Sequence, residues 1–471
     1  MPQPPPSPTS ATPPRAELEQ LGAALHRSAA AARHRGIAVL AGDRKWSATA
    51  AQALLSTTPL REILWIGSDA PGDADFLPPG RALSLLGKEF DAVVYDARAG
   101  FDPDAFGAVA GTIRGGGLLL LTTPPLKTWP DFTDPEYRRI TVAPCQPENV
   151  TGRFLRRAVR VFRDNAEPTL IEQQGQDYIV RRGQTDRPAR TPLDTPPPPY
   201  RTLDQQQAVE AVIKVITGQR RRPVVLTSDR GRGKSAALGL AAANLMRGTA
   251  RHILVTGPGV EAVDPLFRHA GQQLKNARGG RGTLHCGDAT LRFHPPDQIL
   301  RDHPQTDLLL VDEAAAIPIP LLEQLLERYS RIAFATTVHG YEGTGRGFEL
   351  RFRHILDRKT RGWRALQMEA PIRWATDDPL ERFTFRLLML DAAVAPEAAL
   401  RSIRPEACKI ERIDRERLLE DENSLSELFG LLVFAHYRTR PYDLRHLLDG
   451  PNLSIYLMRY REHVVGAVLA A

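Results

Sequence analysis

Cysteine is scarce in this chain of 471 residues, and its three copies are widely spaced at Cys145, Cys286 and Cys408. Because they form no Cys-x-x-Cys pair, the sequence argues against a disulfide framework and against a zinc site built on paired cysteines. No run approaches the ~20 apolar residues that span a bilayer, and residues 1–14 lack the charged start and apolar core of a secretory signal. We therefore expect a cytoplasmic protein with a disordered leader over residues 1–15, no membrane association and no obligate protein partner.

Acidic residues are in deficit, since 62 Lys and Arg against 55 Asp and Glu leave a net charge of +7. Most of the positive charge is arginine, which favours phosphate recognition and suggests a nucleic-acid partner. Arginines gather at Arg138 and Arg139 and again over residues 153–163. The second group could be an RNA-facing ridge or a solvated face; its members at near-helical or strand spacing are Arg156, Arg157, Arg160 and Arg163.

The length predicts about three domains at roughly 150 residues each. Residues 16–165 alternate helical patterns with short apolar runs, at 36–42, 63–67, 91–96 and 116–122. Such runs are typical of parallel strands buried on both faces, so we predict a three-layer α/β domain, serving as a non-catalytic scaffold. Proline then becomes frequent, which predicts a linker over 166–200. A second domain is expected over 201–395 and a third domain over 396–471.

A phosphate-binding loop is predicted at residues 228–235, between an apolar strand and an Ala/Leu-rich helix. Glycines in such a loop turn backbone N–H groups toward phosphates, and the lysine reaches the β- and γ-phosphates. Gly231, Gly233, Lys234 and Ser235 supply these parts. The usual pattern begins with glycine, whereas this loop begins with Ser228.

A second apolar strand ends in Asp312-Glu313, the arrangement of a Walker B motif. We expect Asp312 and Ser235 to bind Mg²⁺ with the nucleotide, and Glu313 to orient or deprotonate the attacking water. Two unrelated buried strands are the alternative explanation.

Two further side chains are candidates for nucleotide contact. Gln205, one of three consecutive glutamines upstream of the loop, is predicted to bind the adenine edge, the alternative being a surface glutamine run. Arg346 follows a strand predicted at 332–337 in a Gly-rich turn, where its charge could reach the γ-phosphate. Arg353 and Arg373 are the next candidates for this role.

Several segments together carry a family resemblance, namely 230–236, 312–318, 336–348, 371–375, 378–381 and, in the first domain, 86–96. From about residue 36 onward the chain resembles the bacterial tRNA(Met) cytidine acetyltransferase family, TmcA. The resemblance implies a RecA-like, helicase-type P-loop ATPase domain between the N-terminal α/β domain and the start of a GNAT-type acetyltransferase domain.

The resemblance also implies an activity: acetylation of the exocyclic amine of the wobble cytidine in elongator tRNA(Met), with acetyl-CoA as donor and consumption of ATP or GTP with Mg²⁺. Acetyl transfer from a thioester to an amine needs no ATP, so we expect hydrolysis to drive a conformational or RNA-remodelling step. Glu313 and Arg346 are the catalytic candidates. The implied nucleotide site comprises Gln205, Ser228, Asp229, Arg230, Gly231, Arg232, Gly233, Lys234, Ser235, Ala236, Ala237 and Arg346.

Residues 396–471 resemble the beginning of the acetyltransferase domain, with hairpin strands at 453–458 and 464–471. The Gln/Arg-x-x-Gly-x-Gly/Ala turn that holds acetyl-CoA in such domains does not occur, so we expect the chain to be truncated and to lack that site. His436 and Tyr437 are candidates for acetyl transfer, and packed positions in a helix or strand are an equal alternative. Two other functions stay open: an RNA-stimulated ATPase without transferase activity, and a P-loop scaffold.

Overall fold

The computed structural model describes residues 15–70, 72, 74–85, 87–184, 196–248, 250–338, 345–360, 362–435 and 439–471. Of residues 345–347, 349 and 350 it describes the backbone alone. The predicted leader and most of the proline-rich segment lie outside these residues. The chain divides into two compact units. The first combines Met1–Arg190, Trp374–Leu431 and Arg440–Ala471, and the second combines Thr191–Arg373 and Leu432–Thr439.

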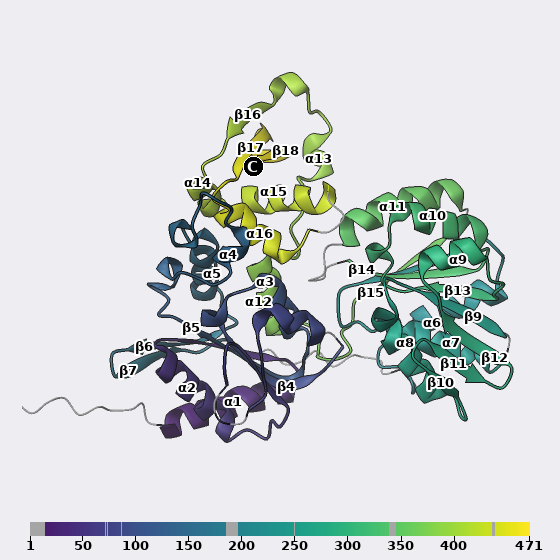
Figure 1. Cartoon of the computed structure of the whole chain (residues 1–471), viewed down its shortest axis with the longest axis horizontal. Coiled ribbons are helices and arrows are strands. Elements are labelled where there is room, and N and C mark those ends of the chain that lie inside the picture. The colour runs from purple at the N-terminus through teal and green to yellow at the C-terminus, as the bar shows by residue number, and fades with distance from the viewer. Residues whose placement is uncertain are drawn as a thin grey trace, which may run out of the picture. The chain divides into compact units, whose positions relative to one another are not determined.

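A seven-stranded sheet organises the first unit, in the order β3-β2-β4-β5-β1-β6-β7 (Figure 1). Each pair of neighbouring strands is parallel except β6 and β7. The predicted apolar runs are confirmed as strands, and the α/β prediction is correct. The strands are β1 (Gly36–Ala41), β2 (Ile63–Ile66), β3 (Phe76–Leu77), β4 (Phe90–Asp96), β5 (Ile113–Thr123), β6 (Thr169–Gln174) and β7 (Asp177–Arg181).

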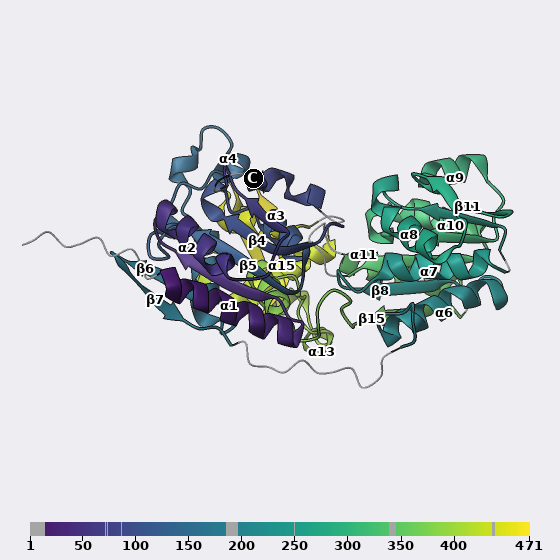
Figure 2. The ribbon, with the colours of Figure 1, turned by 90° about the horizontal axis from the view of Figure 1, so that it is seen from below.

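Helices cover both faces of this sheet. On one face, α1 (Arg15–Ala32) and α2 (Arg44–Ser56) bury leucines and alanines against β1, β4 and β5 (Figure 2). On the other face, α3 (Pro103–Ala110), α5 (Arg153–Asp164) and α12 (Pro379–Leu388) share an aromatic cluster. Phe383 of α12 lies with its ring centroid 5.5 Å from that of Phe162 in α5 and 6.4 Å from that of Phe106 in α3.

The observed strands correct one predicted boundary. The predicted linker over 166–200 begins too early, because residues 169–181 form the strands β6 and β7 of the first sheet. The main segment of the second unit ends at Arg373, and the ATPase domain boundary at 395 stays a prediction. A buried ion pair holds the residues after Arg373 in the first unit: Asp378 accepts hydrogen bonds from Arg35 Nη2 at 2.8 Å and from its backbone N–H at 2.6 Å. Arg35 also lies 3.3 Å over the Trp374 ring.

The arginine-rich segment 153–163 is helix α5, and its charges are paired within the first unit. Arg153 and Arg156 bind Glu416 of α14 (Arg415–Glu420). Arg157 and Arg160 bind Glu422 at the start of α15 (Glu422–Ala435). Four arginines therefore share two carboxylates that lie more than 250 positions away in sequence, so the ridge is tied to other parts of the first unit and keeps part of its positive charge.

A three-stranded antiparallel sheet completes the first unit. The predicted hairpin is confirmed, since β17 pairs with β18 from Ser454↔Ala470 to Tyr460↔His463. Arg445 and Asp134 form an ion pair whose side chains are both fully buried. The strands are β16 (Lys409–Arg412), β17 (Ser454–Tyr460) and β18 (His463–Ala470), and the further helices are α4 (Tyr137–Ile140), α13 (Glu397–Leu400) and α16 (Pro441–Asp449).

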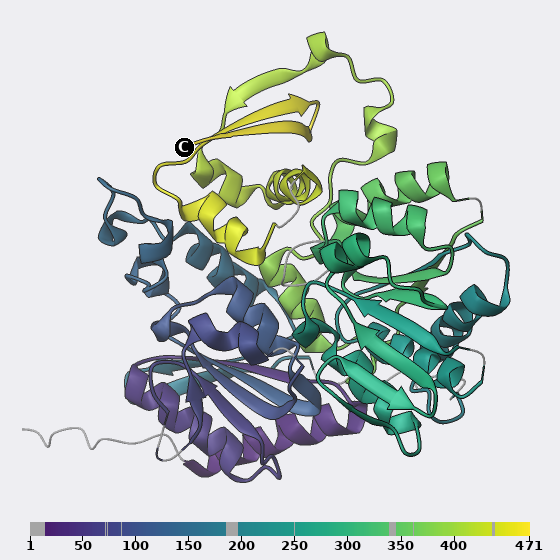
Figure 3. The ribbon, with the colours of Figure 1, turned by 45° about the vertical axis from the view of Figure 1, so that its right-hand side comes forward.

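The second unit contains an eight-stranded sheet in the order β10-β11-β12-β9-β13-β14-β8-β15 (Figure 3). From β12 to β15 the strands are parallel, and β10–β12 form an antiparallel extension at one edge. The strands are β8 (Val224–Ser228), β9 (His252–Thr256), β10 (Arg278–Gly280), β11 (Thr283–Cys286), β12 (Ala289–Phe293), β13 (Leu308–Val311), β14 (Ile332–Thr337) and β15 (Arg364–Met368).

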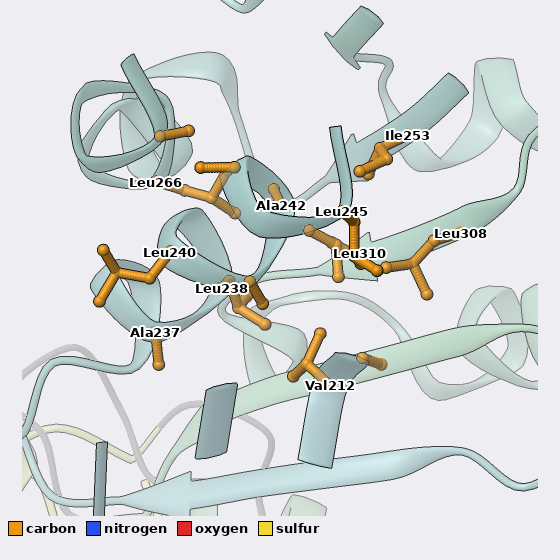
Figure 4. Close-up of a cluster of buried hydrophobic side chains, with 14 of the residues drawn as sticks. Val212, Ala237, Leu238, Leu240, Ala242, Leu245, Ile253, Leu266, Leu308 and Leu310 are labelled. Carbon is orange, nitrogen blue, oxygen red and sulfur yellow. The ribbon is translucent and has the colours of Figure 1, made fainter. Parts of the chain in front are cut away.

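Two hydrophobic cores lie on the two faces of this sheet. One packs α6 (Leu203–Thr217), α7 (Lys234–Met246) and α8 (Val260–Gln273) against the strands, and Figure 4 shows side chains such as Leu238, Leu245 and Leu310 within it. The other packs α9 (Pro296–Asp302), α10 (Ile319–Arg328) and α11 (Gly345–Lys359). No helix in the described part of the chain is long and apolar enough to cross a membrane.

Replacing Asp378 with alanine should lower the free energy of unfolding by about 3–5 kcal/mol, because Arg35 would stay buried without its counter-charge. Chemical denaturation followed by tryptophan fluorescence measures this loss. The control is Asp264→Ala, which removes an exposed i,i+4 pair with Arg268 and should cost less than about 1 kcal/mol. Equal losses in the two variants would contradict a structural role for the buried pair.

Asp104 should make stability fall as the pH rises. Burial is the main cause that raises the pKa of Asp104 to about 7, against the opposing hydrogen bond from the Tyr442 backbone N–H. The folded chain then binds more protons than the unfolded chain between about pH 4 and 7, so stability declines through that window. Asp104→Asn should raise the thermal unfolding midpoint at pH 8, and the gain should shrink toward pH 4.5. Asp264→Asn is the exposed control, and a gain independent of pH would contradict the prediction.

Candidate nucleotide-binding site

The predicted phosphate-binding loop connects the carboxyl end of β8 to the first turn of α7, which begins at Lys234. Gly231 and Gly233 both have φ of +80°, a conformation that favours glycine. A Cβ on Gly233 would lie 2.0 Å from Ile372 Cδ1. Ser228, in contrast, is the last residue of β8, where extended backbone accepts any side chain. The departure from glycine at this position therefore introduces no backbone strain.

Lys234 points into the protein interior. Its side chain is buried, and Nζ donates a hydrogen bond to Ser228 Oγ at 3.0 Å. Burial lowers the pKa of Lys234, while the carboxylates of Glu313 and Asp312 oppose this shift. An ammonium group at the amino end of a helix, beside turned backbone amides, is placed to bind phosphate.

Asp312 lies fully buried directly after β13. Its burial and the neighbouring Glu313 raise the pKa of Asp312 to about 7, against a hydrogen bond from the Ser235 side chain and the charge of Lys234. Asp312 Oδ2 has no hydrogen-bond partner among the described residues. A buried carboxylate oxygen without a partner, beside a serine hydroxyl, fits the oxygen-rich coordination that Mg²⁺ prefers when it binds together with phosphates.

Glu313 adopts a left-handed backbone conformation with φ of +48°. Its Oε2 accepts a hydrogen bond from Thr337 Oγ1 at 3.1 Å. Such strain in a non-glycine residue persists where the surroundings fix it, and it is concentrated at functional sites. The side chain predicted to orient water is thus held by a hydroxyl at the end of a neighbouring strand.

Three threonines belong to this site and were missed by the sequence analysis. Thr256 ends β9, and Thr336 and Thr337 end β14, the strand between β8 and β13. The hydroxyls of Thr256 and Thr336 are buried without a hydrogen-bond partner among the described residues. The sequence could have indicated these threonines, because polar residues that end neighbouring parallel strands meet at one edge of the sheet.

Gln205 lies in the first turn of α6 and is buried, so the alternative of a surface position is excluded. Its Oε1 accepts a hydrogen bond from the Arg201 backbone N–H at 2.8 Å. Its Nε2 lies 3.2 Å from the point that a Cβ on Gly233 would occupy, so the side chain borders the phosphate-binding loop. Gln206 is bonded to Glu210 along the helix surface instead.

Of the charged loop residues, Arg232 is buried and donates to the Arg230 carbonyl at 3.2 Å, with Asp229 4.0 Å away. Ala236 and Ala237 are buried in α7.

The remaining candidates are less closely defined. Arg346 belongs to α11, and its side chain lies outside the described residues, as do His436 and Tyr437 altogether. Arg353 lies on the exposed side of α11 with its guanidinium 5.7 Å from the Trp363 ring centre. Arg373 is half-buried; burial of the imidazole is the main cause that lowers the pKa of His269, and the charge of Arg373 adds to it. These positions stay predictions.

Comparison with known proteins shows which family the chain resembles. Residues 225–391 match the family model "RNA cytidine acetyltransferase NAT10/TcmA, helicase domain", and residues 15–173 match "tRNA(Met) cytidine acetyltransferase TmcA, N-terminal". The chain is 57% identical to the tRNA(Met) cytidine acetyltransferase TmcA of Nitrosococcus halophilus over 96% of its own length. It belongs to the TmcA family.

Other TmcA relatives are more distant, such as those of Haloarcula marismortui, at 38% identity over 95% of this chain, and Vibrio cholerae, at 37% over 92%. The chain spans 61%, 60% and 56% of the lengths of these three relatives. Among solved structures, it is similar to the large terminase of a thermophilic bacteriophage, at 16% identity and a TM-score of 0.30, over 45% of this chain and 62% of that one.

Replacing Gly233 with alanine should weaken ATP binding at least about tenfold, because the new methyl group would meet Ile372 and would force a left-handed alanine. Calorimetric titration with ATP measures the change. Gly248→Ala is the matched control, since a Cβ there meets nothing within 4 Å. If both variants bound ATP as the unchanged chain does, the loop geometry would have no role in binding.

Proposed function

We propose that this protein is a tRNA(Met) cytidine acetyltransferase, which forms N4-acetylcytidine at the wobble position of elongator tRNA(Met) from acetyl-CoA. The observation that carries the proposal is that Lys234, Asp312 and Glu313 lie close enough together for the charge of Glu313 to influence the pKa values of the other two. They do so in a chain that is 57% identical to a TmcA protein over 96% of this chain's length. In this proposal, the second unit hydrolyses ATP or GTP. No residue of the chain is assigned to acetyl-CoA.

Different residues of the second unit have different roles in the proposed hydrolysis. The turned backbone around Gly231 and Gly233 and the Lys234 ammonium bind and orient the phosphates, and Gln205 borders the same loop. Ser235 and Asp312 would hold Mg²⁺, which supplies charge neutralisation on the phosphates. Glu313, held by Thr337, orients the attacking water and accepts its proton. Arg346 is proposed to reach the γ-phosphate from α11.

Hydrolysis has no place in the acyl-transfer chemistry itself, because a thioester is already an activated acyl donor. The free energy of hydrolysis is therefore available to change the conformation of the protein or of its RNA. A wobble base stacked in an anticodon loop must leave the stack before its exocyclic amine is accessible, and unstacking costs a few kcal/mol. We propose that nucleotide turnover in the second unit drives this step.

Lys234→Ala should reduce ATP hydrolysis by the 471-residue chain at least about 100-fold, since alanine removes the buried ammonium group at the amino end of α7 that is proposed to bind the phosphates. Phosphate release measures the rate, and Lys214→Ala, on the exposed surface of α6, is the control. Transfer of labelled acetyl from acetyl-CoA to elongator tRNA(Met), with binding of acetyl-CoA followed by calorimetry, tests the transferase part. Unchanged hydrolysis in Lys234→Ala would contradict the proposed nucleotide site. Hydrolysis without acetyl transfer by the full-length protein would contradict the acetyltransferase part of the proposed function.

A further inference from the structure

The antiparallel extension β10–β12 presents one polar face at the edge of the second sheet. Arg278 pairs with His285, His285 with Thr290, and Thr290 with His252 of β9, so these four side chains form one row across four strands. A second row, Thr283 and Arg292, lies two residues further along β11 and β12 and therefore on the same face. We call these six residues the basic sheet face.

The opposite face of the same strands is apolar. Leu291 is fully buried and pairs with Leu284 and Ile253, and all three belong to or pack against the core beneath α8. Because side chains alternate along a strand, burial of this set directs the basic sheet face away from that core. Arg278, Arg292 and His252 are exposed, and the other three members are half-buried.

The charge on this face is not neutralised. Arg278 and Arg292 have no ion-pair partner among the residues that the structure describes. Nearby acids are engaged elsewhere: Glu261 pairs with Arg281, and Asp288 lies 3.8 Å from Arg251. Asp307 accepts hydrogen bonds from the backbone N–H groups of Arg251 and His252. Residues 275–294 carry four basic residues and one acidic residue.

Protection of the sheet edge explains only part of this arrangement. A charge on an edge strand discourages pairing with another chain, which would account for Arg278 on β10. Arg292 does not lie at the edge, because β12 is hydrogen-bonded to β11 on one side and to β9 on the other. Its exposed guanidinium, two strand spacings or about 10 Å from β10, calls for a different explanation.

We propose that the basic sheet face binds the phosphate backbone of the tRNA, an inference that rests on the proposed function. Charge complementarity selects a polyanion, and the hydroxyls of Thr283 and Thr290 add hydrogen-bonding groups suited to phosphate oxygens. None of the six side chains is a Phe, Tyr or Trp ring on which a base could stack, and Phe293 lies on the opposite, core-facing side. The face therefore contributes affinity and orientation, and it does not read sequence.

The test compares tRNA binding by the 471-residue chain and by the double variant R278A/R292A, measured by fluorescence anisotropy at several salt concentrations. Loss of two phosphate contacts should weaken binding about tenfold at 0.1 M salt and reduce the slope of log K against log salt by about 1.4–1.8. The loss should be the same for elongator tRNA(Met) and for another tRNA. ATP hydrolysis without RNA should be unchanged in the variant.

Two further variants separate a local contact from a general effect of charge. R278K/R292K keeps both charges and should retain most of the affinity. R220A/R222A removes two exposed arginines from the segment that follows α6 and should leave binding nearly unchanged. Equal losses in R220A/R222A and R278A/R292A, or full binding by R278A/R292A, would overturn the proposal and leave the proposed function intact. Failure of the unchanged chain to bind any tRNA would overturn the basic sheet face together with the RNA part of the proposed function, while phosphate release would still report on the nucleotide site.

Discussion

Lys234, Asp312 and Glu313 share a small region at the carboxyl edge of the second sheet, and the candidate site depends on this group of charges. Burial lowers the pKa of Lys234 and raises that of Asp312, so both side chains are held in surroundings that disfavour their own ionised forms. Buried hydroxyls of Thr256 and Thr336 and one oxygen of Asp312 add unused hydrogen-bonding capacity among the described residues. A core selected only for stability would satisfy or remove these groups. Their persistence supports the proposal that this edge of the sheet binds a polar, highly charged ligand.

Features that depend on residues close together in the sequence could be predicted from it. The buried strands were visible as apolar runs bounded by glycine or aspartate, and the loop around Lys234 was visible because its glycines satisfy a local backbone requirement. Gln205 could be named because it precedes β8 at a typical spacing, although only the structure shows that it is buried beside Gly233. Thr336 and Thr337 were within reach of the same reasoning, since they end a strand that the sequence predicts.

Features that depend on distant residues could not be predicted. Nothing near residues 153–160 in the sequence indicates that Glu416 and Glu422 form ion pairs with the arginines of α5, and a run of positive charge without nearby acidic residues resembles a surface. The packing of residues after Arg373 into the first unit could not be predicted for the same reason, because the partner of Asp378 is Arg35, 343 positions earlier. Strands β6 and β7 were predicted to be part of a linker because their sequences are short and largely polar. They become strands of the first sheet because β6 pairs with β1 and β7 pairs with β6.

The division of the first unit into separate stretches of sequence has a consequence for the order of events during synthesis. Its aromatic core is incomplete until Phe383 has emerged from the ribosome, and the buried ion pair between Asp134 and Arg445 cannot form until Arg445 has been made. The main segment of the second unit, Thr191–Arg373, is synthesised between these parts and is nearly contiguous. Contacts of long sequence separation form late, because closing a long loop costs entropy before the contact forms. The second unit is therefore expected to fold first, while the sheet of the first unit, which is made earlier, keeps its α12-facing side uncovered until residues after Arg373 have been made.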